Sequence, residues 1–401
     1  MPQSLDQKSA RRALVVLLAV VFVNIAGFGV VIPLLPFYGK AFHASAGEIG
    51  LMFSAFAVGQ LFAEAFWGRL SDRIGRRPVL IVTIFGTAAT YAALAFAPNI
   101  AVACILRLAG GLMSGNISTI QGYLADVTPA ERRPGRMGLL GSAFSMGFVT
   151  GPAIGGLLAR PRDGVAGFQL PLLAAAGLAA LAAIGVVVFV RETRAAAHME
   201  IPPTPRLQSL SEAFHHPVIA RVLLMSFIVV AGFAGIEATY GLWTQARVGW
   251  GPRQIGFAFM AVGVTGAVAQ GIVTGPLARR FGGARVLTAG LVLVGTGMVV
   301  QLVSPAWPVA MAGFFTVSFG QSLTFPNIAA LISQSAPPER QGEMLGLNMA
   351  GNCLARIGGP LYATQVFSSV SVGAPFATAA FLILPGLVMA MQVARRTRLA
   401  A

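Results

Sequence analysis

Long apolar runs alternate with short polar loops along nearly the whole chain. Twelve such runs span residues 13–37, 47–67, 79–97, 100–124, 136–158, 168–190, 219–244, 255–277, 285–304, 307–332, 343–367 and 373–393. A helix of about 20 mainly apolar residues is long enough to cross the hydrocarbon core of a bilayer. The pattern therefore predicts an all-α, multi-pass membrane protein with twelve transmembrane helices.

The composition supports lipid as the main solvent. Of 401 residues, 56% are hydrophobic and 10% are charged, whereas a soluble domain carries about 25% charged residues. The first apolar run is too long for the core of a signal peptide, and no small-residue cleavage site follows it. We therefore expect it to remain as the first membrane helix.

The positive charges are concentrated in the loops on one side of the predicted membrane helices. A net charge of +15 would suggest a nucleic-acid partner if the charges lay on one soluble surface. If the chain crosses the membrane at each run, 21 Lys and Arg residues lie on the side of the termini and five on the other. The positive-inside rule then predicts both termini in the cytoplasm and no nucleic-acid partner. Arg107 and Arg356 fall inside apolar runs.

The chain contains an internal repeat. Three motifs recur at offsets of 205, 207 and 208 residues: Ala26-Gly27-Phe28 with Ala231-Gly232-Phe233, Gly68-x-Leu70-x-x-Arg73-x-Gly75 with Gly275-x-Leu277-x-x-Arg280-x-Gly282, and Pro129-x-Glu131-Arg132 with Pro337-x-Glu339-Arg340. Secondary transporters are commonly built from parallel repeats, with the substrate site near mid-membrane between them. We predict an N-terminal six-helix bundle over residues 1–191, a cytoplasmic linker over 192–218 and a C-terminal bundle over 219–401.

A dense basic loop with one acid joins the second and third runs. It reads Gly68-Arg69-Leu70-Ser71-Asp72-Arg73-Ile74-Gly75-Arg76-Arg77-Pro78. This loop resembles the signature between helices 2 and 3 of the major facilitator superfamily, and the resemblance extends over essentially the whole chain. It implies two pseudo-symmetric six-helix bundles.

Within that superfamily the chain resembles the twelve-helix drug:proton antiporters, which include tetracycline efflux proteins. The marker is a glycine pattern in the fifth run, associated with exporters: Gly147, Gly151, Pro152, Gly155 and Gly156. Considered without the resemblance, the glycine pattern could serve helix packing alone. Asn24, Thr90 and Val294 stand where the tetracycline pumps carry acids, so tetracycline is not the expected substrate.

A conformational latch is expected at the cytoplasmic ends of helices 2 and 4. Its members are Gly68, Asp72, Arg73, Gly75, Arg76, Arg77, Asp126 and Arg136. Asp72 would accept hydrogen bonds from a helix N-terminus and pair with a nearby arginine such as Arg136, which would favour the outward-facing state. The alternative is a solvated turn acid.

Ionisable residues inside apolar runs are the candidates for proton coupling, because charge in a membrane is costly and marks functional sites. They are Glu64, Glu237, Arg107 and Arg356. Gly111, Ser114, Ser118 and Gln121 follow Arg107 at helical spacing, which predicts one polar stripe facing a cavity or a partner. For each ionisable residue the alternative is a structural tie to a neighbouring group.

Polar and aromatic residues within the runs are candidates for lining a substrate cavity, although most such aromatic residues pack between helices. The candidates are Asn24, Phe28, Ser114, Gln121, Phe233, Tyr240, Gln321, Phe325 and Asn327.

No nucleophile–base pair, phosphate-binding loop or metal-ligand spacing is found, so we expect neither an enzyme nor a cofactor or metal, and an ion gradient rather than ATP as the driving force. The predicted function is proton-coupled efflux of amphipathic drugs or small toxic compounds by alternating access. The alternatives are a metabolite exporter, a proton-coupled uptake symporter for a small nutrient, and a non-transporting receptor or scaffold. We expect a monomer in the bacterial inner membrane, with protons, lipid and a small-molecule substrate as its partners.

Overall fold

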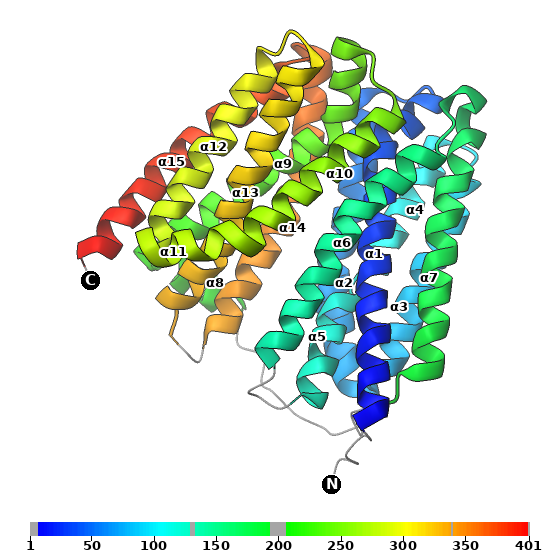
Figure 1. Cartoon of the computed structure of the whole chain (residues 1–401), viewed down its shortest axis with the longest axis horizontal. Coiled ribbons are helices and arrows are strands. Elements are labelled where there is room, and N and C mark those ends of the chain that lie inside the picture. The colour runs from blue at the N-terminus through cyan, green and yellow to red at the C-terminus, as the bar shows by residue number, and fades with distance from the viewer. Residues whose placement is uncertain (1–6, 129–132, 193–205, 338–339, 400–401) are drawn as a thin grey trace. The chain divides into compact units, whose positions relative to one another are not determined.

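The computed structural model describes residues 7–128, 133–192, 206–337 and 340–399, and its regular elements are all helices (Figure 1). Those of the first half are α1 (Gln7–Ala41), α2 (Ala46–Ile74), α3 (Arg76–Ala95), α4 (Ile100–Leu112), α5 (Asn116–Val127), α6 (Arg133–Leu158), the 3₁₀ segment η2 (Pro161–Phe168) and α7 (Gln169–Phe189). Those of the second half are α8 (Arg206–His215), α9 (Pro217–Val248), α10 (Pro252–Val268), the π-helical turn η3 (Ala269–Thr274), α11 (Gly275–Phe281), α12 (Gly283–Leu302), α13 (Trp307–Ser335), α14 (Gln341–Ser369) and α15 (Ala374–Leu399).

The helices confirm the predicted all-α, multi-pass architecture. Each apolar run falls on one long helix, except that the fourth contains α4 and α5 and the eighth contains α10, η3 and α11. Within the described residues, nine helical segments are long and apolar enough to cross a membrane on that basis alone. The long helices α6, α13 and α14 are not among them, because glycine and polar residues interrupt their apolar sequence.

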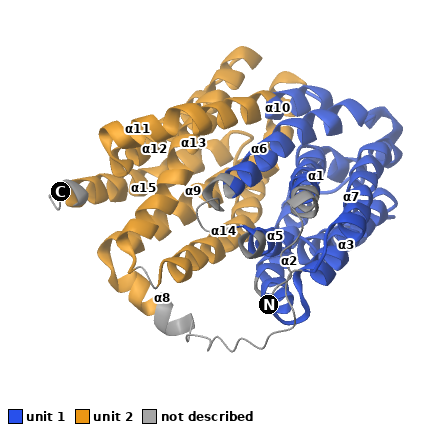
Figure 2. Cartoon of the chain, turned by 60° about the horizontal axis from the view of Figure 1, so that its bottom comes forward, with its two compact units in different colours: residues 1–200, 250–260 blue, residues 201–249, 261–401 orange. Residues whose placement is uncertain are grey.

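The chain folds as two compact units, coloured separately in Figure 2. Unit 1 comprises residues 1–200 and 250–260, and unit 2 comprises residues 201–249 and 261–401. The first part of α10 therefore packs with unit 1, although it belongs to the second repeat. Of the predicted linker, residues 193–205 lie outside the described part of the chain, and α8 lies within it.

Glycines allow the closest helix contacts inside each unit. In unit 1 a Cβ atom at Gly111 of α4 would overlap the carbonyl oxygen of Phe56 in α2, and one at Gly59 would lie 2.7 Å from the backbone nitrogen of Leu112. In unit 2 a Cβ at Gly290 of α12 would lie 2.7 Å from the carbonyl oxygen of Gly320 in α13. Between membrane helices van der Waals contact replaces the hydrophobic effect as the attractive force, so small residues strengthen packing.

We predict that Gly111→Ala destabilises the protein by about 1–3 kcal/mol, the usual cost of overpacking a close contact. The measurement is the midpoint of thermal unfolding of purified protein in detergent. Gly141→Ala in α6 is the matched control, because nothing lies within 4 Å of its Cβ position. Equal losses in the two variants would show that the contact between α2 and α4 is not the cause.

Candidate transport site

The fourth membrane segment is broken. α4 ends at Leu112 and α5 begins at Asn116, with Ser114 Oγ donating a 2.7 Å hydrogen bond to the carbonyl of Gly111. Gly115 lies at the break, where a Cβ atom would come 2.8 Å from the carbonyl oxygen of Ala63 in α2. The predicted polar stripe beyond Arg107 is therefore not one continuous face: Arg107 is buried, whereas Gln121 is exposed.

Arg107 lies inside unit 1 against α2. Its Nε donates a 3.5 Å hydrogen bond to the carbonyl of Met52, and its guanidinium carbon lies 4.4 Å from the ring centroid of Phe56. A carbonyl and an aromatic face together partly offset the cost of about 3 kcal/mol for an arginine in a membrane. These contacts hold the side chain of Arg107 against α2.

An asparagine pair and an aromatic row connect the helices of unit 1. Asn24 Nδ2 in α1 donates a 2.6 Å hydrogen bond to Asn116 Oδ1 in α5. The ring of Phe28 in α1 lies 5.5 Å from that of Phe56 in α2 and 6.2 Å from that of Phe148 in α6. Asn24 and Phe28 are both half-buried, so each retains some exposed surface.

Unit 2 contains a buried ion pair between α9 and α14. Arg356 Nη1 lies 3.5 Å from Glu237 Oε2, and Glu237 is only 4% exposed. The other carboxylate oxygen, Oε1, is buried and has no hydrogen-bond partner among the described residues. The side chain of Arg356 is 34% exposed, so the pair is open on the arginine side.

The two helices that carry this pair approach closely at adjacent positions. A Cβ atom at Gly235 would lie 3.0 Å from the carbonyl oxygen of Gly359. One turn before Arg356, Asn352 Oδ1 accepts a 2.9 Å hydrogen bond from Ser226 Oγ of α9. Polar contacts and small residues thus hold α9 and α14 together around the charged pair.

The other cavity candidates of unit 2 fall into two groups. Tyr240 is fully buried, with its ring stacked 4.2 Å from that of Phe314, and Asn327 Nδ2 donates to the carbonyl of Leu323. Phe233 and Phe325 are half-buried, and Gln321 is buried, with 9% of its surface exposed. Tyr240 and Asn327 are therefore buried inside unit 2, while the two phenylalanines keep exposed surface.

Glu64 differs from Glu237 in having no counter-charge among the residues that the structure describes. It lies half-buried in α2, and within the described residues no hydrogen bond or ion pair engages its carboxylate.

The end of α2 and the start of α3, which only Gly75 separates, form a local network. Asp72 Oδ1 pairs with Arg76 Nη1 at 2.9 Å, and the same guanidinium nitrogen donates a 2.7 Å hydrogen bond to Ser71 Oγ. Gly75 has a φ of 103°, which favours glycine. Arg136 is half-buried in α6, and the side chain of Asp126 lies outside what the structure describes.

Glu192, which sequence reasoning did not select, completes this network. Its Oε1 and Oε2 accept hydrogen bonds of 3.0 Å each from the backbone amides of Arg76 and Arg77 at the start of α3. A carboxylate is favourable there, because the first amides of a helix lack intrahelical partners and carry partial positive charge. The only sequence signal was an acid directly after the sixth apolar run.

The glycine pattern of the fifth apolar run lies on α6 and faces two neighbours within unit 1. Cβ atoms at Gly147 and Gly155 would lie 2.8 and 2.7 Å from the carbonyl oxygens of Phe22 and Val30 in α1, and Gly151 faces Ala26 between them. A Cβ at Gly156 would lie 3.0 Å from the Cα of Gly256 in α10. The pattern thus permits close packing of α6 against α1 and α10.

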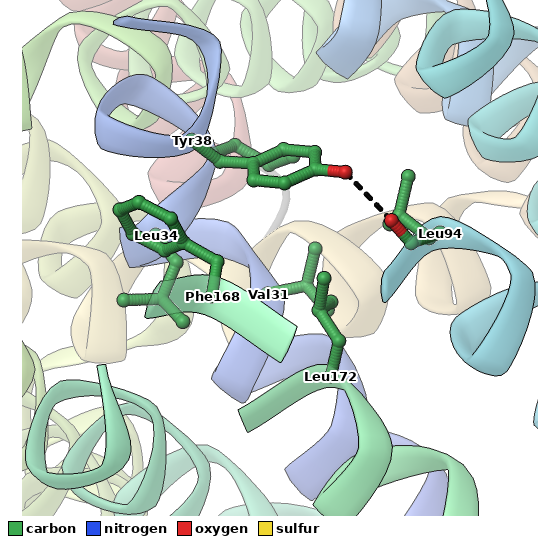
Figure 3. A pocket seen from close by; sticks show the side chains of 7 residues that line it. Val31, Leu34, Tyr38, Leu94, Phe168 and Leu172 are labelled. Carbon is green, nitrogen blue, oxygen red and sulfur yellow. Dashed lines mark hydrogen bonds between the residues drawn. The ribbon is translucent and has the colours of Figure 1, made fainter. Parts of the chain in front are cut away.

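A small apolar pocket lies elsewhere in unit 1, between α1, α3, η2 and α7 (Figure 3). The hydroxyl of Tyr38 donates a 2.6 Å hydrogen bond to the carbonyl of Leu94 beside it, and Phe168 forms part of its wall. It has room for one water molecule at most. We regard it as a packing gap rather than a substrate site.

Comparison with known proteins identifies the family. The model of the Major Facilitator Superfamily matches residues 17–270 and 222–399. The chain belongs to the Major Facilitator Superfamily. It is therefore a multi-pass membrane transporter of small molecules, which agrees with the predicted class of function and with the expectation that it is not an enzyme.

Other members of the superfamily are similar to this protein over nearly the whole chain. Multidrug resistance protein 2 of Bacillus subtilis is 26% identical, covering 94% of each chain. The class C tetracycline resistance protein of Escherichia coli is 28% identical, covering 90% of this chain and 91% of its own. The crystal structure of the human organic anion transporter MFSD10 (TETRAN) matches with a TM-score of 0.69 and 25% identity, covering 95% of this chain and 99% of that one.

We predict that Glu192→Ala lowers the free energy of unfolding of this superfamily member by about 1–2 kcal/mol, as loss of a helix cap does. Glu192→Gln should lose less, because its amide oxygen still accepts one of the two hydrogen bonds. Thermal unfolding in detergent measures both. Asp163→Ala serves as the control, since Asp163 is an exposed acid in η2; a similar loss there would refute the capping role.

Proposed function

We propose that this transporter exports small amphipathic compounds and that protons moving inward drive the export. Two observations support the proposal. Relatives similar over at least nine-tenths of the chain are named for multidrug and tetracycline resistance. The second unit also holds a buried carboxylate, Glu237, with one oxygen paired to Arg356 and the other unbonded.

The ion pair provides a chemical means of coupling. A buried ion pair stays favourable only while both charges remain, because removing one leaves the other without its partner in a medium of low dielectric constant. Protonation of Glu237 would remove the attraction to Arg356 and release a partly exposed cation. Return of the pair requires loss of that proton. The state of the pair is therefore linked to proton uptake and release.

Glu64 is the second proton-binding candidate, in unit 1. No cation among the described residues pairs with Glu64. No opposite charge there offsets the cost of burying its ionised carboxylate. We propose that Glu237 carries the coupling proton through its pair with Arg356, and that Glu64 binds a proton in a supporting role.

The proposed substrate class rests on the half-buried side chains that are candidates for lining the cavity. Half-buried Phe28, Phe233 and Phe325 present apolar surface on membrane helices of both units, and half-buried Asn24 adds an amide. Such a set suits molecules that combine an apolar body with a few polar groups. Tetracycline is not favoured, because Asn24 stands where the tetracycline pumps carry an acid.

The membrane orientation is part of the proposal. The excess of Lys and Arg in alternate loops, 21 against five, supports a cytoplasmic location of both termini by the positive-inside rule. We propose that the chain resides in the bacterial cell membrane, where inward proton flow and outward export of toxic compounds use the same gradient.

The function is tested by a toxicity panel in a bacterial host that lacks its own efflux pumps. Expression of the chain should raise the tolerated concentration of at least one amphipathic compound by about fourfold or more, an effect that a proton uncoupler abolishes. Cells expressing the Glu237→Gln variant, at matched membrane abundance, are the control. Unchanged tolerance across the panel would contradict export of this class.

Coupling is tested in proteoliposomes with an imposed pH gradient. We expect Glu237→Gln to lower uphill transport at least about tenfold, because the variant cannot exchange a proton at this position. The double variant Glu237→Gln/Arg356→Gln separates coupling from stability: it removes both charges, so it should fold better than the single variant and still fail to concentrate substrate. Recovery of uphill transport in the double variant would show that the pair is structural.

A further inference from the structure

The start of α12 in unit 2 has the same backbone geometry as the start of α3 in unit 1. Gly75 and Gly282, which correspond at the repeat offset of 207, directly precede the two helices. Their φ angles are 103° and 86° and their ψ angles are 159° and 141°, a region that favours glycine. The first amides of each helix lack acceptors within their own helix and carry partial positive charge, so both helix starts can bind an anion.

In unit 1 that anion is a carboxylate of the chain itself. Glu192 accepts hydrogen bonds of 3.0 Å from the amides of Arg76 and Arg77, and a Cβ atom at Gly75 would overlap its carboxylate. In unit 2 no side chain among the described residues caps α12, and nothing lies within 4 Å of the Cβ position of Gly282. The two repeats thus share the turn but not the carboxylate.

The sequence explains this difference, because an arginine replaces the glutamate. Where α7 ends, the chain reads Val190-Arg191-Glu192-Thr193-Arg194, and at the end of α15 it reads Ala394-Arg395-Arg396-Thr397-Arg398. The two segments correspond at an offset of 204, and they share both outer arginines and the threonine. Arg396 therefore stands in unit 2 where Glu192 stands in unit 1.

The helices α12 and α15 pack side by side in opposite directions (Figure 1). The Cβ position of Gly373, just before α15, lies 2.9 Å from Leu302 Cδ1 at the end of α12. Further along, the Cβ position of Gly295 lies 3.6 Å from Ile383 Cγ2. Residue numbers therefore fall along α12 as they rise along α15.

This register places the end of α15 beside the start of α12. Gly283, the first residue of α12, lies twelve residues before Gly295, and Arg395 lies twelve residues after Ile383. Each residue of a helix adds a rise of about 1.5 Å. Arg395 and its neighbour Arg396 are therefore at the level of the first turn of α12.

Further arginines lie on the elements around this helix start. Arg279 and Arg280 are in the last turn of α11, and Arg285 is in the first turn of α12. Together with Arg395 and Arg396 they form what we call the arginine cluster, and all five side chains are exposed. A positive charge in the first turn of a helix is unfavourable unless an anion lies near it.

The acids of unit 2 do not neutralise the arginine cluster. Residues 238–338 and 344–401 contain no Asp or Glu, so α11, α12 and α15 offer no carboxylate side chain. The three acids that the structure describes in unit 2 form ion pairs with Arg340 or Arg356 instead. The arginine cluster is therefore suited to an anion from outside the chain.

The arginine cluster lies at one end of two helices that can cross a membrane. The stretches of α12 and α15 that are long and apolar enough to do so run over Gly283–Leu302 and Ala374–Arg396. Their ends at the cluster are therefore at the depth where lipid headgroups begin. A phosphate group is the anion that is abundant at this depth.

An exposed apolar stripe on α15 leads to the arginine cluster. Leu384, Val388 and Met391 are exposed and follow one another at intervals of four and three residues, so they lie on one face of the helix. Arg395 continues this face four residues later. Acyl chains can lie along such a stripe while the headgroup lies beside the arginine, which suits a lipid better than a soluble anion.

We propose that the arginine cluster and the first amides of α12 bind the phosphate of an anionic phospholipid, which takes the place that Glu192 has in unit 1. Arginine suits this role, because its guanidinium group binds phosphate oxygens through paired hydrogen bonds. A zwitterionic lipid would add a positive ammonium group beside five arginines, so the site favours a lipid with net negative charge. The site depends neither on the transported compound nor on the carboxylate that binds the proton.

The experiment measures lipid binding to purified, delipidated protein in a neutral detergent by native mass spectrometry. The probes are dioleoylphosphatidylglycerol, which is anionic, and dioleoylphosphatidylcholine, which has the same chains and no net charge. We expect the anionic lipid to bind at least about tenfold more tightly, since each basic residue near a lipid surface contributes a factor of about five. Inorganic phosphate at an equal concentration should not displace it.

The variant Arg395→Gln/Arg396→Gln removes two charges from the cluster. It should bind phosphatidylglycerol at least about tenfold more weakly and phosphatidylcholine within about twofold of the wild type. The matched control is Arg247→Gln/Arg253→Gln, which removes the same charge from exposed positions outside the cluster. This control should keep the wild-type affinity for both lipids.

Three results would overturn the proposal. The first is equal weakening in the variant and its control, which would indicate a general effect of net charge. The second is phosphatidylglycerol binding no tighter than phosphatidylcholine. The third is displacement of the lipid by inorganic phosphate, which would make free phosphate the ligand. If the double variant does not fold, Arg285→Gln replaces it, and an unchanged affinity for phosphatidylglycerol would also contradict the assignment.

Discussion

Close backbone contact between helices is the constraint on which this structure depends. In a bilayer the helices satisfy their own backbone hydrogen bonds, and lipid is as apolar as the side chains, so helices gain little by hiding apolar surface from it. Attraction must come from short-range contact. The seams between α2 and α4, α1 and α6, α9 and α14, and α12 and α13 all depend on glycines that face a neighbouring backbone.

The two most deeply buried charged side chains of the membrane helices, Arg107 and Glu237, are each compensated within their own unit. Arg107 uses a carbonyl and an aromatic ring, both from α2. Glu237 uses a full counter-charge from α14, yet leaves one oxygen unbonded. Among the described residues no acid pairs with Arg107, whereas a single proton on Glu237 would change its pair with Arg356. This difference is why the proposed coupling rests on Glu237 and assigns Arg107 a structural role.

The sequence alone predicted the helices, their approximate boundaries and the family, because apolar length and short motifs are local properties of the chain. It did not predict the break between α4 and α5 at Gly115, since helical spacing continues through a glycine whose backbone is held by α2. The partner of Arg356 could not be inferred either, because it depends on which helices pack together. Glu192 was missed for the same reason: its role exists only where α7 ends beside the start of α3.

The membership of residues 250–260 in unit 1 has a consequence for biosynthesis. A ribosome releases the chain in order, so the first unit cannot complete its own packing until the seventh membrane helix has already been inserted. Until then Gly156 lacks the helix that it contacts in the finished protein. A polypeptide cut in the linker would therefore yield an N-terminal fragment in which Gly156 of α6 lacks its contact with α10.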